Sequence, residues 1–93
     1  FVGIDTDATV LRAIREGAVD ATVAQNPFGH GYVSSALLRM LDEGWTPRRE
    51  YQFIDAGLVL VTRENLDTYA AEVRRVTAQL VADLPAKHLD PPR

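Results

Sequence analysis

The chain has 93 residues, 46% hydrophobic and 25% charged, which is typical of one small globular domain with its own core. Its net charge of −3, with acidic and basic residues interspersed, excludes the basic face that nucleic-acid binding needs. It contains no cysteine, which excludes disulfides and thiolate metal sites, and no apolar run has the length of a membrane span.

The chain begins at Phe1 rather than at methionine, and Val2-Gly3-Ile4 already has the character of a strand interior. Mature domains seldom begin inside a strand, so we expect an N-terminally truncated chain. Any signal peptide would then have been lost with the missing part.

The first half of the chain predicts strands and helices in alternation. The predicted elements are a strand at Phe1–Ile4, a helix at Asp7–Glu16, a strand at Ala21–Ala24 and a helix at Pro27–Glu43. Gly17 and Gly44 follow the two helices and are expected to end them. Pro27 suits the first turn of a helix, where its missing N–H is not needed.

The second half predicts further strands and one long helix. The predicted elements are a polar loop at Trp45–Glu50, strands at Tyr51–Ile54 and Leu58–Val61, a helix within 63–84 and a loose tail at 85–93. Leu58–Val61 is continuously apolar, so we expect it to be buried on both faces. Thr62 or Asn65 would cap the long helix. The alternation predicts an α/β fold with a mostly parallel sheet and flanking helices.

Polar side chains follow two of the predicted strands. Asp5 comes directly after the first strand, and Gln25 comes directly after the second. Ligands of open parallel sheets bind outside the carboxyl ends of the strands, and successive strands are often neighbours. A carboxylate accepts hydroxyl hydrogens and a primary amide both donates and accepts, so the pair suits a polyhydroxylated ligand such as a sugar. Alternatively, Asp5 caps the following helix, as Thr6 or Asp7 could also do, and Gln25 merely ends a strand.

The stretch VGIDTDATVLRAIREGAVDATVAQNPFGHGYVSSALLRMLDEG, followed by DAGLVLVTRENLD, resembles the C-terminal part of periplasmic sugar-binding proteins of ABC transporters. The ribose- and galactose-binding branch of the type 1 solute-binding fold is the most similar group. The resemblance covers about residues 1–67.

The resemblance implies site and hinge residues. An aspartate after the V-G-x-D strand binds sugar hydroxyls in that family, which corresponds to Asp5, and the glutamine of A-Q corresponds to Gln25. Thr6 and Asn26 are further ligand candidates. The family chain crosses between two lobes, and the second and third crossings correspond to hinge residues Gln25, Asn26, Pro27, Asp55, Ala56 and Gly57.

The same resemblance divides the chain between two lobes. Residues 1–25 and 58–62 would belong to one lobe and residues 27–54 to the other, with a C-terminal helix at 63–84 and a tail at 85–93. A chain holding pieces of both lobes lacks most of each sheet. We therefore expect a C-terminal fragment of a larger receptor, completed by the N-terminal portion of the same protein or by a second copy.

The implied function is a non-catalytic solute receptor that binds a small sugar, or a sugar-like ligand, and delivers it to a membrane permease. The implied location is periplasmic or extracytoplasmic, including a membrane-anchored lipoprotein. The alternative is the effector-binding domain of a LacI-like transcriptional repressor. No catalytic constellation, cofactor motif or metal-ligand spacing is apparent: His30 has no second ligand nearby, and Ser34-Ser35 lacks the nucleophile elbow of a hydrolase.

Overall fold

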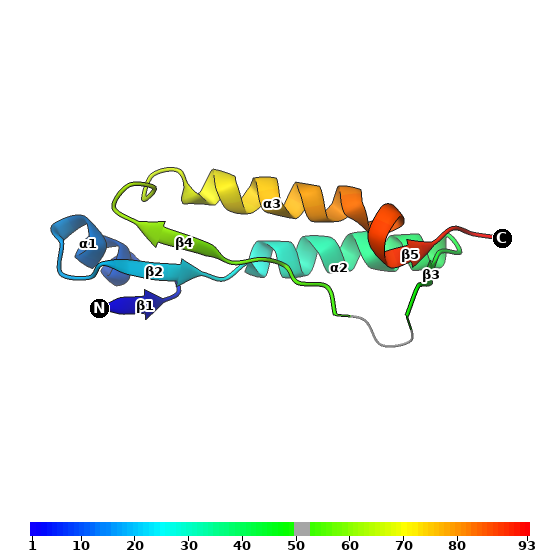
Figure 1. Cartoon of the computed structure of the whole chain (residues 1–93), viewed down its shortest axis with the longest axis horizontal. Helices are drawn as coiled ribbons and strands as arrows, with labels where there is room; N and C mark the ends of the chain where they lie inside the picture. The colour runs from blue at the N-terminus through cyan, green and yellow to red at the C-terminus, as the bar shows by residue number, and fades with distance from the viewer. Residues whose placement is uncertain (50–52) are drawn as a thin grey trace. The chain divides into compact units, whose positions relative to one another are not determined.

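The computed structural model of the chain describes residues 1–49 and 53–93 (Figure 1). The elements in chain order are β1 (Val2–Ile4), α1 (Ala8–Glu16), β2 (Ala21–Ala24), α2 (Pro27–Asp42), β3 (Thr46–Pro47), β4 (Val59–Thr62), α3 (Tyr69–Asp83), the π-helical turn η1 (Leu84–His88) and β5 (Leu89–Asp90). This composition confirms a mixed α/β chain. Its contacts define two units: unit 1 is Phe1–Asn26 with Gly57–Val73, and unit 2 is Pro27–Ala56 with Arg74–Arg93.

Unit 1 contains a three-stranded sheet in the order β1-β2-β4. β1 runs parallel to β2, as predicted, whereas β4 runs antiparallel to β2 with Val59 opposite Ala24. The prediction of a mostly parallel sheet therefore fails for the second pairing. The chain leaves unit 1 after Asn26 and returns at Gly57, beside the same end of β2, so β4 has to run back along it.

α1 begins and ends close to the predicted positions. The Asp7 carboxylate accepts a hydrogen bond from the Val10 N–H at 3.0 Å, which makes Asp7 the N-cap rather than the first helical residue. Gly17 ends the helix with a φ of 84°, a conformation that glycine adopts without a steric penalty.

The core of unit 1 lies on one face of its sheet. Its buried residues are Ile14, Ala24, Val61 and Leu66. Because side chains alternate along a strand, Val2, Ile4 and Leu60 lie on the opposite face, where they are 70%, 67% and 58% exposed. The prediction that Leu58–Val61 is buried on both faces is therefore wrong: within the described part of unit 1, the packing elements lie on the Val61 side.

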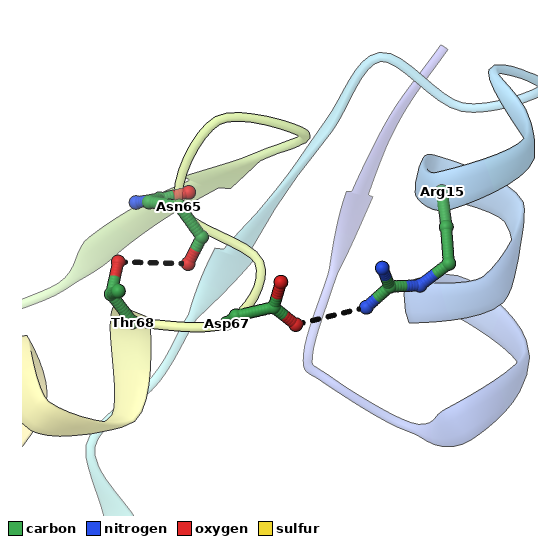
Figure 2. A network of polar contacts seen from close by, with 4 residues as sticks. All are labelled: Arg15, Asn65, Asp67 and Thr68. Carbon is green, nitrogen blue, oxygen red and sulfur yellow. Dashed lines mark hydrogen bonds and ion pairs between the residues drawn. The ribbon is translucent and has the colours of Figure 1, made fainter.

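Asn65 holds the segment between β4 and α3, where its backbone carbonyl also accepts from the Thr68 hydroxyl (Figure 2). Its side chain accepts from the Thr62 N–H at 2.7 Å and donates to the Leu60 carbonyl at 2.8 Å. These backbone groups bond to a side chain rather than to β2. Asn65 therefore supplies hydrogen-bond partners for two backbone groups on the edge of β4 that faces away from β2. The prediction that Thr62 or Asn65 caps the last helix is wrong, because α3 begins only at Tyr69 and the Asn65 side chain is bonded to β4.

Two arginines connect this same segment to α1. Arg15 forms an exposed ion pair with Asp67 at 3.0 Å (Figure 2), and the Arg63 guanidinium donates to the Arg15 carbonyl at 2.8 Å. An exposed ion pair contributes at most about 1 kcal/mol. The guanidinium of Arg63, however, also satisfies a carbonyl in the last turn of α1 that the helix itself leaves open.

Unit 2 packs α2 against the Arg74–Asp83 part of α3. Its buried core residues are Val33, Met40, Leu84 and Leu89, with Trp45 and Ile54 among the partly buried side chains around them. α2 begins at Pro27, as predicted, and ends at Asp42, followed by Gly44 with a φ of 103°. Trp45, which follows Gly44, packs against this core as a partly buried side chain.

The C-terminal residues are not the loose tail that we predicted. Leu84 and Leu89 are fully buried, and β5 pairs antiparallel with β3. The physical reason is that Leu84 of η1 and Leu89 of β5 enter the core of unit 2, which the proline-rich composition around them conceals. The last helix accordingly ends at Asp83 and continues as a π-helical turn.

Two predictions for the preceding segment also need correction. The polar loop predicted at Trp45–Glu50 contains β3, and its last residue lies outside the described residues. Of the strand predicted at Tyr51–Ile54, Tyr51 and Gln52 lie outside the described residues, and Phe53 and Ile54 are not in a strand. Among the helices of the described residues, none combines the length and apolar character needed to cross a membrane.

Candidate functional site

Asp5 directly follows β1 and has a constrained backbone. Its φ is 76°, a positive value that no other non-glycine residue in the described part of the chain adopts. The Asp5 N–H donates to the Val23 carbonyl at 2.8 Å, and the Asp5 carbonyl accepts from the Thr22 hydroxyl at 2.7 Å. These two bonds to β2 hold a conformation that costs about 1 kcal/mol or more, and such residues often occur at ligand sites.

The Asp5 side chain remains available to a ligand. It is exposed, and it makes no hydrogen bond or ion pair with another described residue. The alternative role as a helix cap is wrong for both Asp5 and Thr6, because the Asp7 carboxylate caps α1. Thr6 is half-buried beside it.

Gln25 and Asn26 have different environments. Gln25 is exposed as the first residue after β2, whereas Asn26 is only 3% exposed and is bonded within the chain. β1 and β2 are parallel, with Ile4 opposite Val23, so their carboxyl ends lie at one edge of the sheet. The structure therefore brings Asp5 and Gln25 to the same edge, and it places the Asn26 side chain in the interior.

This edge offers hydrogen-bonding groups from two side chains. The Asp5 carboxylate can accept two hydroxyl hydrogens, and the Gln25 amide can donate and accept, which suits neighbouring hydroxyl groups of one small molecule. Within residues 1–49 and 53–93, no cluster of three or more His, Cys, Asp or Glu side chains could hold a metal ion. The edge is thus suited to binding a neutral polar ligand.

The borders between the two units fall within the predicted crossing segments. Unit 1 ends at Asn26 and resumes at Gly57, inside Gln25–Pro27 and Asp55–Gly57. A third border, between Val73 and Arg74, lies inside α3 and was not predicted. Hinge rotation at Gln25, Asn26, Pro27, Asp55, Ala56 and Gly57 stays a prediction.

Thr22 is a supporting residue that the sequence interpretation did not identify. It is fully buried, and its hydroxyl holds the carbonyl of Asp5. The signal was a hydroxyl side chain in the middle of the apolar strand Ala21–Ala24, because a buried hydroxyl has to find a hydrogen-bond acceptor.

The ligand roles of Asp5 and Gln25 therefore rest on local geometry and on the sequence resemblance, and those of Thr6 and Asn26 stay predictions. Comparisons of the chain with protein-family models, with curated proteins and with solved structures found no match.

Proposed function

We propose that this chain is part of a solute-binding receptor of a sugar ABC transporter, which binds a small carbohydrate and delivers it to a membrane permease. The proposed role is non-catalytic and extracytoplasmic. Its ligand is a small sugar or a sugar-like molecule, and the remainder of the site comes from the N-terminal portion of the same protein or from a second copy.

The observation that carries the proposal is the placement of Asp5 and Gln25 at one edge of the sheet. Both side chains are exposed, and the Asp5 backbone is preorganised by its hydrogen bonds to the Val23 carbonyl and from the Thr22 hydroxyl. Preorganisation favours binding because the ligand does not have to order the residue that it contacts.

The exposed face of the sheet is a second, weaker support. Val2, Ile4 and Leu60 are apolar and exposed on one face, and a contiguous exposed apolar patch often marks a surface that another chain covers. Under the proposal, further receptor chain covers this face. The hinge residues at Gln25–Pro27 and Asp55–Gly57 would then allow the receptor to close around its sugar.

The proposal is tested by titration calorimetry of the chain joined to the N-terminal portion that completes the site, with a panel of pentoses and hexoses and with acyclic polyols for comparison. We expect at least one sugar to bind, and Asp5→Asn to weaken its binding by more than about tenfold, because a hydrogen bond to a charged group is worth about 1.5–3 kcal/mol. Asparagine has a similar size and also tolerates a positive φ, so the backbone is retained.

Asp20→Asn is the matched control, because Asp20 is an exposed aspartate that precedes β2 at the opposite end of the strand. Sugar binding should be unchanged in this variant. If no sugar binds, or if Asp5→Asn and Asp20→Asn behave alike, this edge is not a sugar site.

A further inference from the structure

A groove on unit 2 is separate from the candidate site. One hollow of about 520 Å³ is lined by Phe28, Gly31, Tyr32, Ser35, Ala36, Arg39 and Val81. A second hollow of about 290 Å³ is lined by Phe28, Tyr32, Arg74, Thr77, Ala78 and Val81. The two hollows share Phe28, Tyr32 and Val81, so they form one continuous groove between α2 and α3.

The groove is lined by two aromatic rings, and there is open space beside Gly31. The rings of Phe28 and Tyr32 are 5.6 Å apart, and the two residues remain 49% and 54% exposed. Gly31 has no neighbouring atom within 4 Å of the position where a side chain would begin, so the groove has room there for a partner's side chain. Aromatic side chains that are exposed beside such a hollow are typical anchors of binding surfaces.

The groove is positively charged at both ends, although the chain as a whole is acidic. Arg74 lines the smaller hollow, and Arg39 lines the larger one. Arg74 takes part in no ion pair among the described residues. Among the described residues, the Arg39 side chain has only a long, exposed contact of 3.7 Å, with Glu43 directly after α2.

The length of the groove favours an elongated occupant. Phe28 and Arg39 are eleven residues apart on α2, which corresponds to about 16 Å or about three helical turns. A small molecule would fill one hollow, whereas an amphipathic helix can place apolar side chains along both. A second copy with its own groove face to face would bring arginines against arginines, so charge disfavours it.

We propose that this groove binds an amphipathic helix of about three turns, whose apolar stripe lies on Phe28, Tyr32 and Val81 and whose acidic residues at its two ends meet Arg39 and Arg74. This inference does not depend on the proposed sugar receptor, because it uses other residues and another class of partner.

The probe is a fluorescently labelled synthetic peptide of about three turns, stapled in helical form, with a leucine stripe and glutamates at both ends. The comparison peptide has lysines in place of the glutamates. Fluorescence anisotropy with the whole 93-residue chain should give binding of the glutamate peptide that is at least about tenfold tighter than binding of the lysine peptide. Exchanging both arginines, in Arg39→Glu with Arg74→Glu, should reverse this preference.

Gly31→Trp should fill the open space in the groove and weaken binding of the glutamate peptide by about tenfold or more. The fold should tolerate it, because the site has space and glycine is a poor helix former. Ser34→Trp is the matched control, since Ser34 is exposed on the same helix but does not line the groove. A thermal melt of each variant checks that the chain remains folded.

Three results would overturn the proposal. The first is that neither peptide binds, or that both bind equally. The second is that Gly31→Trp and Ser34→Trp have the same effect on the glutamate peptide. The third is a self-association in sedimentation that Gly31→Trp abolishes, which would assign the groove to a second copy.

Discussion

The two units of this chain are built differently. Unit 1 is organised around a sheet, and its core lies on one face while Val2, Ile4 and Leu60 remain exposed on the other. Unit 2 has a helical core that includes the buried side chains of Leu84 and Leu89 near the C-terminus. A sheet exposes strand ends, where Asp5 and Gln25 can meet a small ligand, whereas a helix pair leaves a groove such as the one beside Phe28 and Tyr32.

The largest predicted effects come from the two cores. Ile14→Ala in unit 1 and Leu84→Ala in unit 2 should each lower the free energy of unfolding by about 2–5 kcal/mol, because both side chains are almost completely buried. Denaturant unfolding measures the loss. Amide exchange should further show which unit loses protection first in each variant. A loss below about 1 kcal/mol for Leu84→Ala would mean that the C-terminal segment does not contribute to the core of unit 2.

The edge of β4 in unit 1 should depend on Asn65. Asn65→Ala removes two hydrogen bonds to the backbone of β4 and should cost about 0.5–1.5 kcal/mol per bond. Asn65→Asp keeps the acceptor for the Thr62 N–H but sets a carboxylate against the Leu60 carbonyl, so it should not restore stability. Equal stability of Asn65→Asp and the parent chain would contradict this arrangement.

The backbone of Asp5 gives a smaller effect on the same sheet. Asp5→Gly should be more stable than Asp5→Ala by about 1 kcal/mol, because alanine is strained at a φ of 76° and glycine is not. Thermal unfolding of the two variants measures the difference. If alanine is the more stable, the left-handed conformation of Asp5 is not maintained in solution.

The smallest predicted effect concerns Asp83 in unit 2. Hydrogen bonds from Gln79 and then Lys87 lower the pKa of Asp83 below the ordinary value of 3.8. Because the folded pKa lies below the unfolded one, the stabilisation is present above the ordinary value and is lost as the pH falls through the folded pKa.

Unfolding measured from about pH 6 down to about pH 3 should therefore show a slightly weaker loss of stability in Asp83→Asn than in the parent chain. The effect is small because the ion pair with Lys87 is accessible to solvent. A steeper loss in this variant would contradict the assigned hydrogen bonds.

The local elements could be predicted from the sequence because their signals are local. Asp7, Gly17 and Pro27 stand at the helix ends that their chemistry favours, and Ala21–Ala24 is a strand as expected. The same reasoning placed Asp5 and Gln25 after two strands. Their common edge followed from the parallel pairing of sequential strands.

The long-range features could not be predicted, because no local pattern specifies them. β3 pairs with β5 across more than forty residues, and Pro47 and the C-terminal prolines suggested loops instead. The apolar run at β4 indicated burial but not which faces are covered. The left-handed backbone of Asp5 depends on Thr22, whose hydroxyl is directed by the pairing of β1 with β2.

The most direct test of the central claim is a nitrogen–proton correlation spectrum of the labelled chain during titration with the sugar that binds. The account predicts that the backbone amides of Asp5 and Thr6 and the side-chain amide of Gln25 shift together and saturate at one affinity, while the signals of Phe28 and Tyr32 stay in place. Shifts confined to unit 2, or no shift at Asp5 and Gln25, would contradict a ligand site at the carboxyl ends of β1 and β2.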